Sequence, residues 1–296
     1  MDNKEFCHSL ESVIFVDPGK RGISEFWTHG CLYEAASRIL KQPKDKKSYV
    51  LTGFCCMNKN CETDGPIGTS VLCKVLRDLG FNSEILCDPC SKNVVEAAAL
   101  GLPVVCASNV SELESDLSFA ISIERPGRTI KTNDYRTMRA RDISDVTMPL
   151  DYLFPAFNDE TQKKNYLTVS VGDGGNEVGT GNVHEQVAKY VSMGSDINTV
   201  TTCDVLVLAG VSNWGGIAIA AALAVCSDNI EIAKSFIEIC GRQREMLDKM
   251  LEQGSYDGIS GKVIPVVDGM EFDKEHTEIN NKLIAVVKEK YPSLSQ

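Results

Sequence analysis

An acidic, glycine-rich loop with the sequence GDGGNEVGTGN directly follows an apolar run and carries residue types that suit catalysis. Asp173 and Glu177 bring two carboxylates to this loop, and Asn176 adds an amide. A pair of carboxylates can divide the work of a general acid and a general base, or it can hold Mg²⁺ through oxygen ligands. Asp173, Asn176 and Glu177 are therefore candidate catalytic residues, and Asp173 and Glu177 are candidate metal ligands. The alternative is a strand-to-helix turn with solvated acids.

The glycines of the same loop make Gly174 and Gly175 candidate substrate-binding residues, because they allow a tight turn and a close approach of the backbone to a ligand. The dinucleotide-binding pattern G-x-G-x-x-G is not cleanly met. The acids would also repel a pyrophosphate. The loop therefore favours a small ligand over a nucleotide.

A second acidic turn, ETDGPIG, brings Glu62 and Asp64 to the start of a predicted helix. Pro66 suits the first position of that helix. Glu62 and Asp64 are either further catalytic carboxylates or ordinary helix caps.

The stretch VSNWGG follows another apolar run and offers two polar side chains beside an indole. Ser212 and Asn213 could donate hydrogen bonds to an oxyanion, while Trp214 walls the pocket. We treat all three as candidate substrate-binding residues, with a helix N-cap as the alternative.

A locally basic stretch begins at ERPGR in a chain whose formal net charge is −11. The planar guanidinium groups of Arg125 and Arg128 suit bidentate binding of a carboxylate or a phosphate, so both are candidate substrate clamps. The alternative is a set of surface ion pairs with Asp134, Asp142 and Asp145.

The twelve cysteines raise the alternative of a thiolate metal site or a redox pair. Only Cys87 and Cys90 have C-x-x-C spacing, and the neighbouring CCMNKNC stretch lacks a matching pair. A zinc site is therefore weakly supported. The four histidines form no local metal pair in the sequence.

The elements that must position these loops alternate between apolar, β-branched runs and helical patterns, which is typical of βαβ units. We therefore expect an α/β fold: a mostly parallel sheet flanked by helices in Rossmann-like three-layer form, with an irregular insertion near 125–165 and a single domain over 1–296. Polar loops follow several of the strands, and the carboxyl ends of parallel strands meet at one edge, where ligands bind. The expected strands are 48–54, 82–88, 102–108, 117–124, 166–172 and 203–210, with a late one at 262–269; the expected helices are 26–42, 68–80, 91–101, 215–226, 231–254 and 276–290.

Composition narrows the class of protein. A hydrophobic content of 43% is ample for a core, and a net charge of −11 argues against nucleic acid as a partner. The N-terminal residues lack the features of a signal or transit peptide, and no run is long enough to span a membrane. We therefore expect a cytoplasmic protein without a membrane partner, with the mitochondrial matrix as the alternative compartment.

Four motifs, taken in order, resemble the D-glutamate cyclase domain: TGF…ETDGPIG, ERPGR, GDGGNEVGTGNV and AGVSNWGG. The resemblance covers nearly the whole chain. It implies the reversible conversion of D-glutamate to 5-oxo-D-proline and water, with a small molecule as the partner and a homo-oligomer as an option. This chemistry requires no cofactor, although Mg²⁺ would fit the acids.

Two other function classes stay open from the residues alone. One is a Mg²⁺-dependent enzyme that acts on a small phosphorylated substrate, and the other is an amino-acid-binding protein without catalysis.

Overall fold

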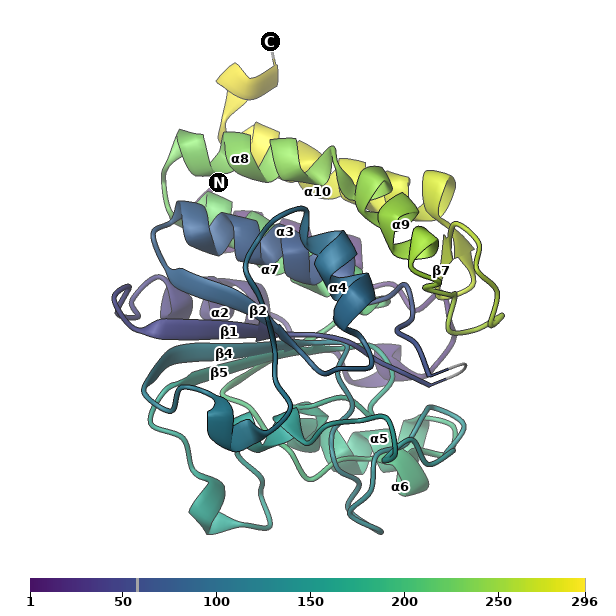
Figure 1. Ribbon diagram of the computed structural model, residues 1–296. Coiled ribbons are helices and arrows are strands. Elements are labelled where there is room, and N and C mark those ends of the chain that lie inside the picture. Colours follow the sequence, from purple (N-terminus) through teal and green to yellow (C-terminus); the bar gives the residue numbers. More distant parts are fainter. Residues whose placement is uncertain (57–58, 296) are drawn as a thin grey trace.

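The six central strand runs form one parallel sheet in the computed structural model, which describes residues 1–56 and 59–295 (Figure 1). Neighbouring strands lie in the order β3-β2-β1-β4-β5-β6, and every pair is parallel. This confirms the predicted α/β fold. The strands are β1 (Lys47–Leu51), β2 (Asn82–Cys87), β3 (Val104–Cys106), β4 (Leu117–Ile123), β5 (Leu167–Gly172) and β6 (Val205–Leu208).

The order of the strands places a crevice at the middle of the sheet. The sheet grows one way from β1 to β3 and the other way from β4 to β6, so the chain changes direction between β1 and β4. Loops that follow strands on either side of such a switch point diverge and leave room for a ligand. Every residue of β4 and β5 is buried, as expected for central strands that are covered on both faces.

Helices cover the sheet unevenly (Figure 1). On one face, α3, α4 and α7 lie next to the strands, and α8, α9 and α10 form a further layer outside them. The other face carries α5, α6 and irregular chain. The bounds are α1 (Asn3–Ile14), α2 (Cys31–Ile39), α3 (Pro66–Asp78), α4 (Lys92–Ala99), α5 (His184–Tyr190), α6 (Gly194–Ile197), α7 (Ser212–Cys226), α8 (Ile230–Cys240), α9 (Gln243–Glu252) and α10 (Thr277–Lys290).

Helix α7 runs between the sheet and the outer helices and is buried from Ser212 to Val225. Its mostly small, apolar residues leave no polar face, which is typical of a core helix. A Cβ atom on Gly216 would lie 3.0–3.1 Å from backbone atoms of Gly68 in α3, so the two helices touch backbone to backbone. This close packing brings the N-termini of α3 and α7 together at the sheet edge.

Several elements differ from expectation: α5 and α6 were not expected, and the predicted helix 26–42 forms only over Cys31–Ile39. The predicted helix 231–254 is interrupted at Gly241 and forms α8 and α9. Of the predicted late strand only β7 (Val266–Val267) forms, paired antiparallel with β8 (Met270–Glu271). Helix α1 was not expected, although the capping box of Asp2 and Glu5 marks its start in the sequence.

The predicted irregular insertion is present. Between β4 and β5 the described chain holds only two short 3₁₀ turns, Leu150–Leu153 and Glu160–Gln162. Two ion pairs anchor its beginning, one from Arg125 and one from Arg128. The segment lies below the sheet in Figure 1 and contributes one wall of the cleft described next.

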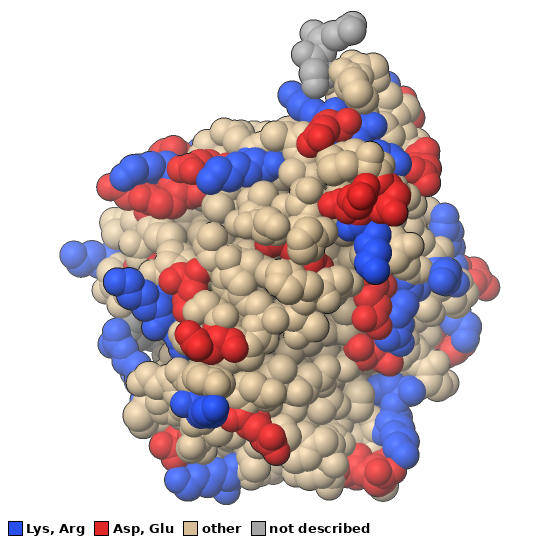
Figure 2. All heavy atoms as spheres, turned by 180° about the vertical axis from the view of Figure 1, so that it is seen from behind, with Lys and Arg blue, Asp and Glu red and all other residues tan. Residues whose placement is uncertain are grey.

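The surface mixes both signs of charge. On the face that Figure 2 shows, acidic and basic side chains are interspersed, and much of its middle is uncharged. A nucleic-acid-binding face would carry a continuous basic patch, and this face carries none. Among the described helices, not one combines the length and the apolar character that crossing a membrane demands.

Candidate active site

A cleft of about 200 Å³ opens at the carboxyl ends of the central strands. Acidic and basic side chains face each other across it. Its lining includes the acids Glu62, Glu124, Asp173 and Asp268 and the bases Arg21, Arg139 and Arg141. A small cleft with charged side chains in its lining thus lies at the edge of the sheet where the site is predicted.

Three carboxylates meet at the base of this region. One oxygen from each of Asp64, Glu124 and Asp173 lies within 4.8 Å of the others. The three residues follow three adjacent strands: Asp64 ends the loop after β1, Glu124 follows β4, and Asp173 follows β5. We call these residues the acid trio. Its members are almost completely buried, with exposed fractions of 3%, 6% and 2%.

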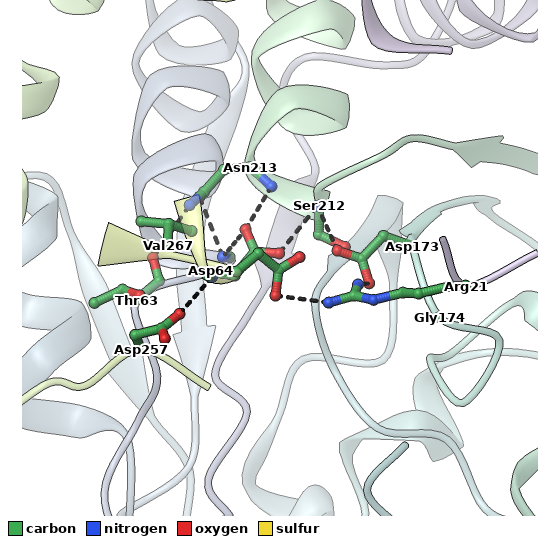
Figure 3. A network of polar contacts seen from close by, with 12 residues as sticks. Arg21, Thr63, Asp64, Asp173, Gly174, Ser212, Asn213, Asp257 and Val267 are labelled. Carbon is green, nitrogen blue, oxygen red and sulfur yellow. Dashed lines mark hydrogen bonds and ion pairs between the residues drawn. The ribbon is translucent and has the colours of Figure 1, made fainter. Parts of the chain in front are cut away.

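The N-terminus of α7 holds two members of the trio (Figure 3). The Ser212 N–H donates to Oδ2 of Asp64 at 3.0 Å and to Oδ2 of Asp173 at 3.1 Å. The Asn213 N–H donates to Oδ1 of Asp64 at 2.8 Å. Free N–H groups and the helix dipole favour carboxylates at a helix N-terminus. Ser212 and Asn213, which we expected to donate hydrogen bonds to an oxyanion, thus direct their backbone N–H groups to the protein's own acids.

The side chain of Asn213 joins α7 to the loop that carries Asp64. Its Oδ1 accepts N–H bonds from Gly65 and Gly68 at 3.1 and 2.7 Å, and its Nδ2 donates to the Thr63 carbonyl at 3.1 Å. Asn213 therefore positions Asp64 rather than a substrate.

Arg21, whose side chain is 13% exposed, supplies a cation that the residue patterns in the sequence did not predict. Its guanidinium bonds to Asp173 and, at 2.7 Å, to Asp268. Asp17 accepts the Arg21 N–H at 2.9 Å and so shapes the turn that presents this side chain. The DPGKRG stretch fits no phosphate-binding pattern, so no local signal marks Arg21.

Burial raises the pKa of the acids around the cleft, because the charged form loses its hydration. The effect is large for Glu62, Asp64 and Glu124, whose pKa values lie well above their ordinary range; repulsion from neighbouring carboxylates adds to it.

Burial also raises the pKa of Asp173, and it raises the pKa of Asp268 to about 7. At both residues the positive charge of Arg21 opposes the rise. The pKa values of the acids in the cleft are thus all raised, most strongly where no cation lies beside the carboxyl group.

Glu124 and Asp268 share a strained backbone. Their φ angles are +47° and +54°, in the left-handed region that residues other than glycine rarely adopt. Such strain costs free energy and clusters at functional sites. Both residues line the cleft, so the strain directs two carboxyl groups toward one space.

Glu177, predicted as a catalytic acid and metal ligand, instead closes its own loop. Its carboxylate accepts backbone N–H bonds from Asp173, Gly174 and Gly175 at 3.2, 2.7 and 2.7 Å. Gly175 has a φ of +97°, which the tight turn requires. Glu177 does not line the cleft and is absent from the acid trio, because its oxygens face the turn.

Asn176 does line the cleft, and its Nδ2 donates to the Arg136 carbonyl at 2.8 Å. This bond ties the acidic loop to the irregular segment. Gly174 lies against the same segment, since a Cβ there would meet the sulfur of Met138 at 2.4 Å. Gly174 and Gly175 thus shape the loop, and neither is among the residues that line the cleft.

The expected clamps Arg125 and Arg128 lie outside the cleft, and we correct that assignment. Arg125 is 1% exposed and donates to Asp88 at 2.6 Å and to two backbone carbonyls. Arg128 donates to Asp151 at 2.7 Å and stacks on Tyr152. Both guanidinium groups are held by partners within the protein, although the Nε of Arg125 is buried without a hydrogen-bond partner among the described residues.

Two other arginines of the same basic stretch do line the cleft. Arg139 and Arg141 are exposed, and neither forms an ion pair within residues 1–56 and 59–295. They are therefore available to a carboxylate of a ligand, which is the role that we expected of their neighbours.

Trp214 does not wall the cleft. Its indole N–H donates to His276 at 2.9 Å, and the side chain is 3% exposed in the core.

The cysteines are unbridged throughout the part of the chain that the structure describes. Burial raises the pKa of the Cys61 and Cys87 thiols, which disfavours reactive thiolates. Cys55, Cys56 and Cys61 flank Met57 and Asn58, which lie outside the described residues. The thiolate alternative gains no support.

A second group of potential metal ligands does not line the cleft. His8 and His29 lie 3.7 and 3.8 Å from the same oxygen of the buried Glu11. This group could not be predicted from the sequence, because the two histidines lie on α1 and on the turn before α2 and approach each other only in the folded chain.

Comparison with known proteins identifies the family. The family model described as D-glutamate cyclase-like, C-terminal, matches residues 10–284. The chain belongs to the D-glutamate cyclase-like family. It is also 30% identical to human mitochondrial D-glutamate cyclase over 322 aligned positions, which cover 94% of this chain and 51% of the human protein. The chain thus spans about half the length of this curated relative, and the resemblance seen in the sequence is confirmed at the level of the family.

Proposed function

We propose that this member of the D-glutamate cyclase-like family converts D-glutamate reversibly to 5-oxo-D-proline and water. The family match and the human relative support this reaction. The structural observation that carries it is the cleft itself, where buried carboxyl groups face two unpaired arginines.

The reaction sets clear chemical demands. The α-amine loses its protons and attacks the γ-carboxyl carbon, a C–N bond forms, and one oxygen of that carboxyl leaves as water. A proton acceptor must therefore lie near the amine, and a proton donor near the departing oxygen. The α-carboxylate needs a cationic partner that keeps the substrate in place.

The cleft offers a group for each demand. Arg139 and Arg141 suit the α-carboxylate, because a guanidinium binds a carboxylate through two parallel hydrogen bonds. Glu62 and Asp268 line the same space outside the acid trio, so they are the carboxyl groups placed to exchange protons with the substrate. Asn176 can donate to an oxygen of the reacting carboxyl.

Nuclear magnetic resonance of the purified protein with each enantiomer of glutamate and of 5-oxoproline tests the proposal. We expect D-glutamate and 5-oxo-D-proline to interconvert and the L-enantiomers to remain unchanged. Saturable binding of D-glutamate without any turnover would instead identify an amino-acid-binding protein. Metal-dependent hydrolysis of phosphate esters without glutamate turnover would identify the other enzyme class.

A further inference from the structure

One carboxylate oxygen of the acid trio has no partner. Oε2 of Glu124 is buried and forms no hydrogen bond with any part of the chain that the structure describes. The Ser212 hydroxyl is in the same condition, although the backbone N–H of that residue binds Asp64 and Asp173. A buried polar atom without a partner costs free energy, so native proteins rarely leave one unpaired.

The charges of the trio are also uncompensated. Asp64, Glu124 and Asp173 carry three negative charges when ionised, and among the described residues the cation that contacts them is Arg21, through Asp173. Arg21 is shared with a further acid, Asp268. Backbone N–H groups donate hydrogen bonds to Asp64 and Asp173, but these groups carry only partial positive charges. A buried group of like charges is relieved either by uptake of protons or by a counter-ion, and a bound divalent cation would take the place of the protons.

The spacing of the oxygens suits one cation. In an octahedron with Mg–O distances of about 2.0–2.1 Å, opposite oxygens lie about 4.2 Å apart. The trio, without an ion, holds its three oxygens within 4.8 Å of one another. Small side-chain movements would therefore bring all three into contact with a central ion.

We propose that Asp64, Glu124 and Asp173 bind one divalent cation that prefers oxygen ligands, such as Mg²⁺ or Mn²⁺. The ligands differ from the expected pair, because Glu177 closes the loop and Asp64 and Glu124 take its place beside Asp173. A cation here adjoins the cleft and can act as a Lewis acid on a substrate carboxyl group. That part of the inference rests on the proposed cyclase function, whereas binding itself does not.

The test measures Mn²⁺ binding to chelator-treated, full-length protein by electron paramagnetic resonance and titration calorimetry. A His8→Ala/His29→Ala background removes the second group of ligands. We expect one Mn²⁺ per chain, displaced by Mg²⁺. Absence of binding at millimolar Mn²⁺ would overturn the proposal.

Two variants locate the ion. Glu124→Gln keeps the shape of the side chain and removes a charge, so we expect it to fold and to weaken Mn²⁺ binding at least about tenfold, the lower range even for residues that only support ligands. Without metal it should be at least as stable as the parent, because it relieves repulsion. Glu62→Gln is the matched control from the same cleft, and it should change the affinity only a few-fold. Equal losses in both variants would mean that the cleft attracts cations without a defined site.

Turnover separates the two proposals. Conversion of D-glutamate by protein that binds no Mn²⁺ would reject the metal site and retain the cyclase. Tight Mn²⁺ binding without D-glutamate turnover would retain the site and reject the cyclase.

Discussion

The indole Nε1 of Trp214 donates a hydrogen bond to Nδ1 of His276, with 2.9 Å between the two nitrogens. The other ring nitrogen of His276 lies 2.9 Å from the Val267 carbonyl and donates to it. One nitrogen thus accepts and the other donates, so His276 is neutral in this arrangement. Burial lowers its pKa accordingly.

This pair predicts how stability depends on pH. Protonation of Nδ1 would break the hydrogen bond from Trp214. Below about pH 6.5, His276 therefore binds a proton in the unfolded chain more readily than in the folded protein. The free energy of unfolding should therefore fall as the pH drops from about 7 through the lowered pKa of His276. Urea unfolding across this range measures it. His276→Gln can keep both hydrogen bonds and should lose this part of the dependence, whereas His184→Gln should retain it.

Glu177 should matter through the shape of its loop. Glu177→Ala leaves three backbone N–H groups without their acceptor and should lower the free energy of unfolding by about 1–3 kcal/mol, the cost of unsatisfied buried groups. Glu177→Gln retains one acceptor oxygen and should recover part of this loss. Melting midpoints and turnover are measured together. A Glu177→Ala protein that melts normally yet loses about 100-fold in turnover would show that the carboxylate acts directly.

Arg139 and Arg141 should bind the substrate. Arg139→Gln and Arg141→Gln should each raise the KM for D-glutamate about tenfold or more, since a hydrogen bond to a charged group contributes about 1.5–3 kcal/mol. Uniform loss of binding leaves kcat nearly unchanged. Arg136→Gln is the matched control, because Arg136 is paired with Asp134 and does not line the cleft. Initial rates over a range of D-glutamate concentrations give the KM of each variant. An unchanged KM in both variants would exclude Arg139 and Arg141 as binding partners of the substrate carboxylate.

Arg125 should be structural. Arg125→Met removes one partner of a buried ion pair and strands Asp88, so we expect a loss of about 3–5 kcal/mol in the free energy of unfolding. Replacing both partners, as in Arg125→Met/Asp88→Leu, should recover part of it. Denaturant unfolding gives both values. A stable Arg125→Met protein that no longer binds D-glutamate would restore the clamp role.

The fold could be predicted further than the site. The runs of β4 and β5 are rich in apolar residues, and polar loops follow them. Both the parallel sheet and its functional edge can therefore be predicted from the sequence. Asp64, Asp173 and Asn176 could be placed at that edge for the same reason. The break at Gly241 between α8 and α9 could not be predicted, because the helical pattern of apolar residues continues across it.

The roles of single side chains depend on contacts that no local pattern encodes. Glu124 was not predicted as a site residue, although it lies next to Arg125 in the sequence. Its position in the cleft depends on a left-handed backbone that no sequence pattern indicates. Arg21 and Asp268 lie near opposite ends of the chain, and their place in the site follows from the ion pair that the fold forms between them. The arginines of one basic stretch look alike in sequence, yet burial commits two of them to ion pairs and leaves two at the cleft.

The ion pair from Arg21 to Asp268 has a consequence for how the protein withstands proteases. It joins a turn that precedes the sheet to a hairpin that follows it, and both meet at Asp173. A molecule held in the cleft would therefore restrain the two outlying segments at once and suppress the local openings through which a chain is cut. Trypsin should therefore cleave the chain near either segment more slowly when the cleft is occupied.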